Sequence, residues 1–285
     1  FIVLIGIMEV LLSIYEDSLS KDINHSKSFE SISNNNNNIL IIGNSLTRKG
    51  VDHQLFESYI NDEIITEGGV GYIYPDDTSI IEWYYIFYRY FSQSKIYPKQ
   101  LYIIFARNQL ATAKIEFEEI QRISNYNQFH SLMNVIVEEE LSLPQSIDLY
   151  LTKIFRIYAY RERIKKRILD IIPNYRITIR KFNSKSVAKI KPEKNKNNYY
   201  HLNKIIQLIE ELSIKTTFCA IPLPKSYKLD GELIKIIDSS YYCELANFQN
   251  SFDFTNNEFI DGYHLNQNGS QKFTNILAEY ISSKN

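Results

Sequence analysis

Three residues far apart in this sequence have the types and spacing to do chemistry together. Ser45 directly follows an apolar run that ends in Gly43–Asn44. Asp261 and His264 stand three residues apart, about twenty residues before the last residue of the chain. A serine hydroxyl becomes a nucleophile when a histidine takes its proton, and a carboxylate fixes the tautomer of that histidine. The sequence therefore predicts a Ser-His-Asp triad with His264 as the base and Asp261 as the orienting acid.

An acyl-transfer site also needs hydrogen-bond donors for the oxyanion of the tetrahedral intermediate. The predicted donors are the backbone N–H groups of Ser45 and Gly71 and the side-chain amide of Asn108. Gly71 ends the glycine-rich stretch 67–71, which is typical of a turn after a strand. Asn108 follows the apolar run 99–105.

Each motif alone also has a structural interpretation. Gly-Asn-Ser after a strand is a common turn, and the glycine cluster and Asn108 fit ordinary turns. Asp-x-x-His before a helix fits a capping loop, with Asn266 or Asn268 as the cap. The catalytic interpretation is favoured by the order of the motifs, because a serine, a glycine and an asparagine each follow a strand and Asp-x-x-His precedes the last helix.

Alternating apolar and helical segments predict the scaffold that must position these residues. Strands are expected at 38–43, 63–66, 99–105, 215–221 and 252–254, and helices at 52–60, 79–92, 201–212, 229–242 and 268–282. This alternation predicts an α/β fold, a flavodoxin-like three-layer sandwich with a central, mostly parallel five-stranded sheet. Right-handed crossovers place all carboxyl ends of the strands on one edge, so the five predicted site residues are expected to meet there.

Residues at about 111–198 show no clear strand pattern, so we expect a helical insertion with a basic loop. Residues 153–196 contain 15 Lys and Arg against 3 Asp and Glu, although the whole chain has a net charge of −1. Such a block can bind an anionic polysaccharide, an anionic lipid or nucleic acid, or it can be a solvated helix face. Tyr158, Tyr160 and Tyr175 within it could stack on bases.

The N-terminal segment 1–15 is strongly apolar, and Glu9 is its only charge. It is predicted to be part of a membrane anchor or signal segment; the alternative is an amphipathic helix packed on the domain. Residues 16–37 have the polar composition of a linker, and 38–285 form the α/β domain. This layout indicates an extracytoplasmic protein of the cell envelope, which argues against nucleic acid as a partner.

Cysteine and histidine usage predicts no cofactor and no metal. The chain has two cysteines, which make no disulfide framework, and no cluster of Cys and His. The remaining histidines are expected to be surface or structural residues: His25, His53, His130 and His201.

On these motifs the chain resembles the SGNH (GDSL-type) hydrolases over residues 38–110 and 200–283. The similar blocks are 43–46, 68–71, 106–109 and 261–266. The resemblance implies Ser45 as nucleophile, Gly71 and Asn108 as oxyanion residues, and Asp261 and His264 as the rest of the triad. The chain departs from the family pattern at Asn44, where Asp is usual, at Ala106, where Gly is usual, and at Gln109, where Asp is usual.

The continuation 45–52 is similar to membrane-anchored members of that family that act in acylation of cell-envelope polysaccharides. The leading expectation is a serine esterase that cleaves acyl esters, acetyl esters above all, of a carbohydrate or a small molecule. An O-acyltransferase that modifies a cell-envelope or exopolysaccharide would use the same residues. A non-catalytic glycan-binding module on the same scaffold is the third alternative.

Overall fold

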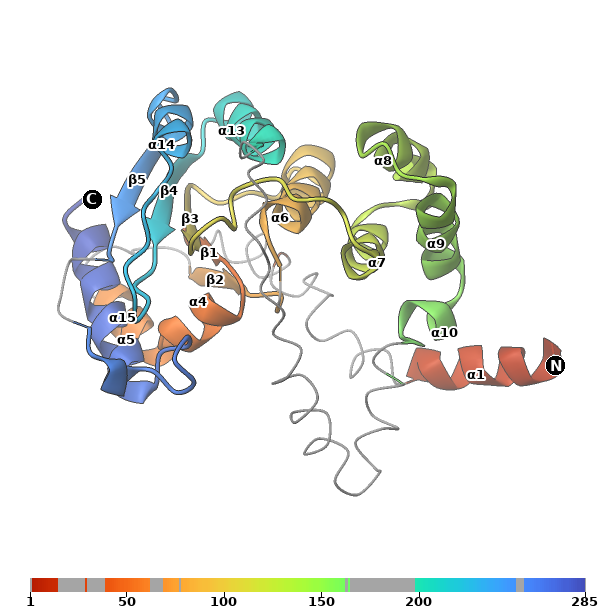
Figure 1. Ribbon diagram of the computed structural model, residues 1–285, viewed down its shortest axis with the longest axis horizontal. Helices are drawn as coiled ribbons and strands as arrows, with labels where there is room; N and C mark the ends of the chain where they lie inside the picture. Colours follow the sequence, from red (N-terminus) through yellow and green to blue (C-terminus); the bar gives the residue numbers. More distant parts are fainter. Residues whose placement is uncertain are drawn as a thin grey trace, which may run out of the picture. The chain divides into compact units, whose positions relative to one another are not determined.

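The structure is a computed structural model that describes residues 2–14, 29, 39–61, 69–76, 78–161, 164, 198–249 and 254–284. The chain divides into two compact units (Figure 1). The helical unit comprises Phe1–Lys21 and Ile115–Asn197, and the sheet unit comprises Asp22–Lys114 and Asn198–Asn285. All five predicted site residues belong to the sheet unit.

Five strands form one parallel sheet in the sheet unit. They are β1 (Ile39–Ile42), β2 (Val70–Ile73), β3 (Gln100–Phe105), β4 (Lys215–Ala220) and β5 (Cys243–Asn247). The strand order is β2-β1-β3-β4-β5, and every neighbouring pair is parallel. The predicted α/β fold is confirmed, and this order is the flavodoxin-like one. The strand order reverses between β1 and β3, where ligands of such sheets bind beyond the carboxyl ends of the strands.

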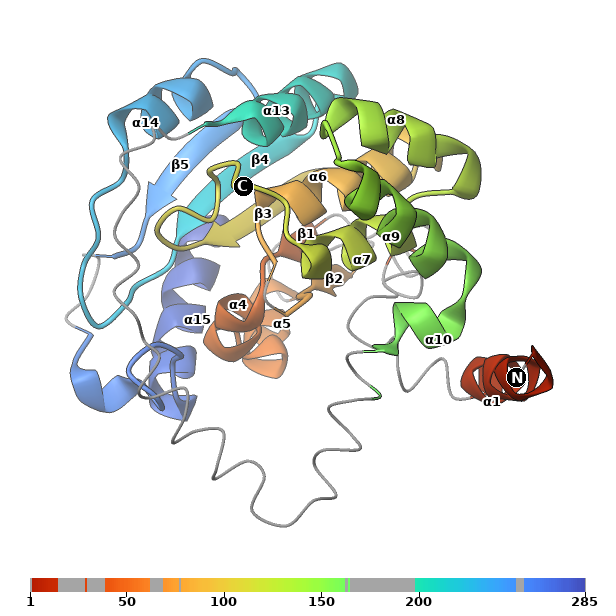
Figure 2. The same ribbon diagram turned by 45° about the vertical axis from the view of Figure 1, so that its right-hand side comes forward.

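Helices cover both faces of the sheet and complete the three layers (Figures 1 and 2). One face carries α4 (Ser45–Gly50), α5 (His53–Asn61) and α15 (Gln267–Ser282). The other face carries α6 (Ile80–Phe87), which continues as a π-helix over Tyr88–Gln93, together with α13 (Tyr200–Leu212) and α14 (Gly231–Asp238). A short 3-10 turn, Asn256–Glu258, precedes α15.

The core explains why these apolar runs become strands. All four residues of β1 are buried, as expected for a central strand with helices on both faces. On the α15 face, Ile39 and Ile41 join a cluster that includes Phe273 and Leu277. Burying each such side chain contributes about 1.5–3 kcal/mol. This packing therefore fixes the strand ends from which the loops at the carboxyl edge begin.

Two predicted strands are placed differently by the structure. The prediction at 63–66 lies outside the described residues, and the second strand is Val70–Ile73. The fifth strand is Cys243–Asn247, whereas Phe254, the described residue of the segment predicted as a strand, is in no strand. Both real strands lie at the edges of the sheet, where half-exposed, weakly apolar residues give a poor sequence signal.

The helix boundaries follow their capping residues. The helix predicted to start after Asp76–Thr78 begins instead after Ser79, whose side chain and that of Glu82 form a capping box. The helix predicted at 229–242 ends at Asp238, because the chain must turn before it enters β5. The cap of α15 is Asn266, which accepts from the backbone N–H of Gly269.

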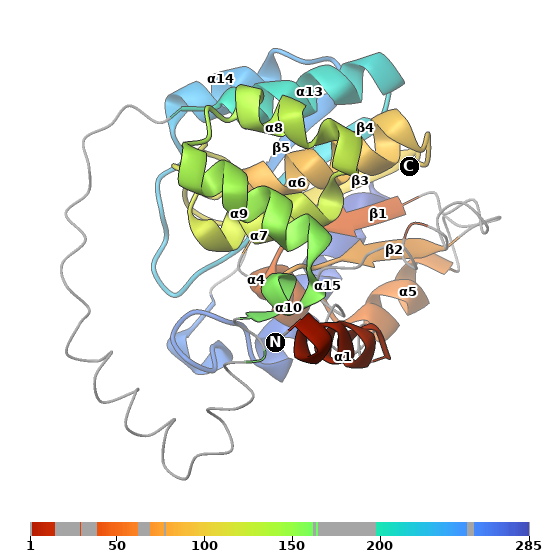
Figure 3. The same ribbon diagram turned by 90° about the vertical axis from the view of Figure 1, so that its right-hand side faces the viewer.

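The described part of the helical unit, within 115–161, contains helices and no strand, as predicted for the insertion. The helices are α7 (Phe117–Tyr126), a 3-10 turn (Phe129–Ser131), α8 (Leu132–Glu138), α9 (Leu143–Ile154) and α10 (Arg156–Ala159). α7 packs beside α9, and the N-terminal helix α1 (Ile2–Ile14) packs beside α10 (Figure 3).

The N-terminal segment has a structural role in this unit. The carboxylate of Glu9 accepts from the backbone N–H groups of Arg156 and Ile157, each at 2.9 Å, in the first turn of α10. Leu12 packs against Ala159. In the part of the chain that the structure describes, no helix combines the length and the apolar character needed to cross a bilayer.

Candidate active site

Ser45 stands at the carboxyl end of β1, as the first residue of α4. The turn before it is tight: a side chain at Gly43 would collide with Thr47 and come within 2.9 Å of the Ile104 carbonyl. Glycine is therefore needed for the close approach of strand and helix. Ser45 itself is partly exposed, so its hydroxyl can meet a substrate.

Asn44 uses both ends of its amide. It is buried, its Oδ1 accepts from the Leu46 backbone N–H at 3.0 Å, and its Nδ2 donates to the Thr78 carbonyl at 3.1 Å. An aspartate, the usual residue of the resembled family, could cap the helix but could not donate to Thr78. The departure from the family pattern thus has a structural reason, which is the tie between the Ser45 turn and the loop after β2.

The Asp261–His264 loop is held by its own backbone. Oδ1 of Asp261 accepts from the backbone N–H groups of Tyr263 and His264, at 3.0 and 2.8 Å. Gly262 has φ +74°, a conformation that glycine adopts without strain. The turn leaves Asp261 Oδ2 free to reach the His264 ring, with Oδ2 at 2.8 Å from Nδ1.

A short hairpin fixes this loop at the sheet edge. Phe259 and Leu265 form an antiparallel bridge, and the Ile260 N–H donates to the His264 carbonyl at 2.8 Å. Asn266 caps α15 directly after the bridge. The capping interpretation of this motif is therefore correct for Asn266, while Asp261 and His264 remain available for another task.

The Asp261–His264 loop lies against Ser45. Ser45 Oγ lies 3.0 Å from His264 Nε2, across 219 positions of sequence. With the proton on Nδ1, His264 donates to Asp261 and accepts from the Ser45 hydroxyl. The three predicted catalytic residues thus form a continuous hydrogen-bonded relay, although the sequence alone left a turn and a capping loop open as alternatives.

The environment of Asp261 keeps its carboxylate charged. The backbone N–H of His264 is the largest cause, the His264 ring adds to it, and together they lower the pKa of Asp261 to about 2. Burial acts in the opposite direction, and the Tyr263 N–H makes the least of the lowering contributions. The Asp261 side chain is 53% exposed and that of His264 25%, so this end of the relay is open to solvent.

Asn108 lies in the exposed turn after β3, at the carboxyl edge of the sheet. No described residue hydrogen-bonds its side-chain amide. The turn is shaped by Gln109, whose Oε1 accepts from the Ala106 N–H at 2.8 Å, and by Arg107, whose φ is +52°. The Arg107 guanidinium lies 5.3 Å from the centre of the Tyr263 ring, so this turn borders the Asp261–His264 loop.

Gly71 does not lie at the end of its strand, so the prediction that it supplies an oxyanion N–H is wrong. It is the second residue of β2 and is paired with Leu40 of β1. Its N–H is about 7 Å before the strand end, at about 3.3 Å per residue. The segment that reaches the carboxyl edge beside Ser45 is Tyr74–Asp76, because β2 ends at Ile73. This strand was not located from the sequence because it overlaps the glycine cluster and because Tyr72, one of its four residues, is half-exposed.

One ion pair at this edge was not predicted from the sequence. Arg48, one helical turn after Ser45, pairs with Asp76 at 2.8 Å. The three-residue spacing from Ser45 in a helix would have placed Arg48 on the face of the serine. This pair joins α4 to the loop after β2, as Asn44 does through Thr78.

The basic block 153–196 lies mostly outside the described residues. Two of its members have structural partners within the helical unit. Lys153 donates to the Ser124 carbonyl at 3.2 Å, and Arg161 pairs with the buried Asp148 at 2.9 Å. These two residues are thus engaged within the unit rather than forming a solvated helix face; polymer binding by the rest of the block stays a prediction.

Among the described residues, no group of three His, Cys, Asp or Glu side chains could hold a metal ion. No protein-family model matches the chain, and a search of curated proteins finds no match. The resemblance to SGNH hydrolases therefore rests on the motif residues and on the geometry described above.

Proposed function

We propose that this protein is a serine-dependent carboxylic-ester hydrolase of the SGNH type that acts on acyl esters, above all acetyl esters. The observation that carries the proposal is the relay of 3.0 and 2.8 Å from Ser45 Oγ through His264 to Asp261. Such spacing is what proton transfer from a nucleophile to a positioned base requires. The position of the relay, at the switch point of a flavodoxin-like sheet, supports the same reading.

In the proposed first half-reaction, Ser45 Oγ attacks the ester carbonyl carbon while its proton passes to His264 Nε2. Asp261 stabilises the imidazolium, and the carbonyl oxygen becomes the oxyanion. The Ser45 backbone N–H, which has no acceptor within the first turn of α4, and the Asn108 amide are the proposed donors to it. His264 then returns the proton to the leaving alcohol, and an acyl-Ser45 ester remains.

In the second half-reaction a water molecule repeats these steps in reverse. His264 takes its proton, the hydroxyl oxygen attacks the acyl carbon, and Ser45 leaves with the proton as the acid product is released. A sugar hydroxyl in place of water makes the same chemistry an O-acyl transfer. The basic residues of 153–196 favour an anionic polysaccharide as such an acceptor, at the cell envelope that the N-terminal sequence indicates.

Labelling and hydrolysis test the proposal together. Wild-type protein is expected to hydrolyse 4-nitrophenyl acetate and to be labelled by a fluorophosphonate probe at Ser45, and Ser45→Ala is expected to lose both. Ser58→Ala, at an exposed serine whose hydroxyl donates to the carbonyl of Leu55 in α5, is the matched control. Full hydrolysis by Ser45→Ala would refute the assignment of the nucleophile. Adding glycerol and measuring acetylglycerol against acetate then separates transfer from hydrolysis.

A non-catalytic glycan-binding module is the second candidate, and the displaced Gly71 favours it, because one expected oxyanion donor is absent from the sheet edge. This candidate predicts no labelling of Ser45 and no turnover, together with glycan binding that Ser45→Ala leaves unchanged.

A further inference from the structure

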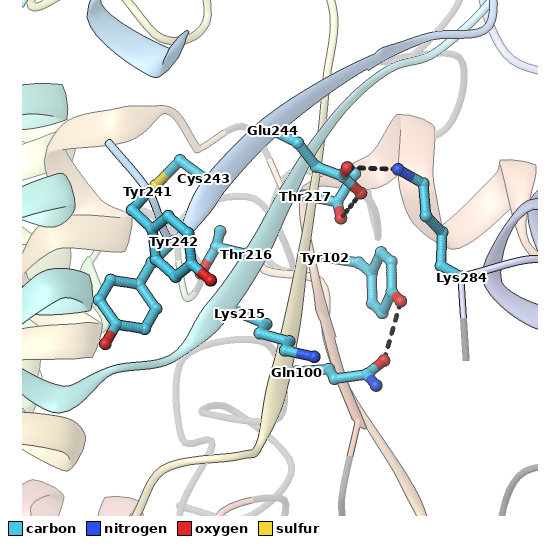
Figure 4. Close-up of a pocket in the computed structure, with 10 residues that line it drawn as sticks. All are labelled: Gln100, Tyr102, Lys215, Thr216, Thr217, Tyr241, Tyr242, Cys243, Glu244 and Lys284. Atoms are coloured by element: carbon cyan, nitrogen blue, oxygen red, sulfur yellow. Dashed lines mark hydrogen bonds and ion pairs between the residues drawn. The ribbon is translucent and has the colours of Figure 1, made fainter. Parts of the chain in front are cut away.

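A cavity of about 360 Å³ lies at the amino-terminal ends of β3, β4 and β5 (Figure 4). Gln100, Lys215 and Cys243, the first residues of these strands, line it. Because the strands are parallel, this edge is the one opposite Ser45. The volume falls within the range of small-molecule sites, about 300–1,000 Å³.

The floor of the cavity is a polar part of the sheet. The strand register places Tyr102, Thr217 and Glu244 in one row across β3, β4 and β5, with Gln100 beside Lys215 two residues earlier and so on the same face. Neighbours in a row point to the same face. Further along the strands the same face becomes apolar and packs under α15. The side chains at the strand starts are therefore left as a hydrogen-bonding surface beyond the end of that helix.

Glu244 lies at the centre of this surface, and its negative charge is balanced by Lys284. It accepts from the hydroxyls of Thr217 at 3.0 Å and Tyr280 at 2.9 Å, and it pairs with Lys284 at 2.6 Å. Burial acts to raise the pKa of Glu244, but the bonds from Lys284, Tyr280 and Thr217 outweigh it and lower that pKa. The carboxylate is thus held ionised and in a fixed orientation.

Lys215 gives the cavity its unbalanced charge. Its side chain is exposed, and no described residue pairs with it. The charged residues that line the cavity are Lys215, Lys284 and Glu244, two cations against one anion, so the net charge is +1. A ligand that carries one carboxylate would complete this set.

An aromatic rim stands beside Lys215. Tyr241 is 94% exposed, and its ring lies 5.4 Å from that of Tyr242 at an interplanar angle of 87°. Figure 4 shows this pair to the left of the strands and Tyr102 and Lys284 to the right. An exposed aromatic ring beside polar groups suits a sugar, whose ring has an apolar face and a hydroxyl rim.

We propose that this cavity binds a short acidic glycan of the uronate type. The sugar carboxylate pairs with Lys215, the apolar face of the sugar ring lies on Tyr241, and the hydroxyls meet the polar floor around Glu244. β3 is six residues long, so the cavity lies roughly 20 Å from the edge that carries Ser45. The cavity is therefore a separate site, and binding there does not depend on the proposed ester hydrolysis.

Titration of the full chain with two tetrasaccharides tests this proposal. The probes are tetragalacturonate and neutral maltotetraose, followed by calorimetry and by NMR shifts of backbone amides at the starts of β3, β4 and β5. We expect tetragalacturonate to bind at least tenfold more tightly than maltotetraose. Lys215→Gln should remove most of that preference, and Tyr241→Ala should weaken both probes about tenfold. Lys235→Gln and Tyr59→Ala, exposed residues on α14 and α5, are the matched controls.

The outcomes are distinct from those of the hydrolase test. Ser45→Ala should bind tetragalacturonate as wild type does, so an inactive protein would leave this proposal intact. No binding of tetragalacturonate, equal binding of the two probes, or insensitivity to both Lys215→Gln and Tyr241→Ala would overturn it.

Discussion

Two histidines of the sheet unit occupy opposite kinds of environment. His264 is on a loop at the carboxyl edge, with a carboxylate at one ring nitrogen and the Ser45 hydroxyl at the other. His53 is in α5, stacked on Tyr72 at 3.9 Å with an interplanar angle of 6°. Nε2 of His53 and the hydroxyl of Tyr74 are buried, with no hydrogen-bond partner in the described structure.

The difference shows what makes a histidine suited to proton transfer. His264 has a partner that fixes its tautomer and one that can give up a proton, and it remains partly exposed. Among the described residues no hydrogen bond gives His53 either partner, and burial lowers its pKa below 6.5, against the opposing effects of Glu57 and Asp52. The cluster of His53, Tyr72 and Tyr74 is thus a packing region. Its buried unpaired polar groups lower the free energy of unfolding. Five predictions test this contrast.

The largest expected effect is on turnover at His264. His264→Gln should lower kcat for 4-nitrophenyl acetate by about 10⁶-fold, because Ser45 loses its base. His53→Gln, the same substitution in the packing region, should leave kcat within about twofold. Comparable losses in both variants, with both proteins folded by circular dichroism, would contradict the assignment.

Asp261→Asn should lower kcat by about 10⁴-fold with little change in KM, because the amide no longer fixes the tautomer of His264 or stabilises its charge. The chemical shifts of the His264 ring nitrogens should report the change in tautomer. Asp238→Asn, at an exposed residue that ends α14, is the control. If Asp261→Asn kept wild-type kcat, the relay would be a structural contact only.

Asn108→Ala should lower kcat by about 10²–10³-fold through loss of an oxyanion donor. The KM should change little, because the donor acts on the transition state. Asn268→Ala, exposed in the first turn of α15, serves as the comparison. An effect on KM alone would place Asn108 in ground-state binding.

Two tyrosines test the cost of unpaired groups. Tyr74→Phe removes a buried, unpaired hydroxyl and should raise the free energy of unfolding by about 1 kcal/mol. Tyr227→Phe removes a hydroxyl that donates to the Ile221 carbonyl at 3.0 Å, and it should lower that free energy by about 1 kcal/mol. Urea titrations measure both, and the same sign in both variants would contradict the account of the His53 region.

The smallest expected effect is on how the free energy of unfolding changes with pH. The folded-state pKa of His53 is lowered, so the unfolded chain binds its proton first, and stability is lost as pH falls below about 6.5. The pKa of Asp261 is lowered from 3.8 to about 2, so its contribution is lost only between those values. Glu244 and Glu258, whose pKa values are also lowered, add to this acidic loss. Unfolding titrations should show it separately from the loss due to His53, and His53→Gln should remove only the upper one.

The predictions from sequence succeeded where the signal was local and strong. The long apolar runs of β1, β3 and β4 and the amphipathic helices α5, α13 and α15 were located to within about two residues. The edge strands were misplaced, because β2 contains Gly71 and two half-exposed residues and β5 contains Glu244 at its second position. A strand of four or five residues with one apolar face gives little signal in sequence.

The residue types of a triad and their order along the chain are present in the sequence, and the alternation of segments predicts a sheet with these residues on one edge. The folded chain was needed to show that Ser45, His264 and Asp261 lie at hydrogen-bonding distance and that Gly71 lies away from that edge. The physical reason is register: one residue along a strand moves a group by about 3.3 Å and turns its side chain to the other face. A hydrogen bond cannot form after a shift of that size. The register is set by the packing of whole helices and strands rather than by any local motif.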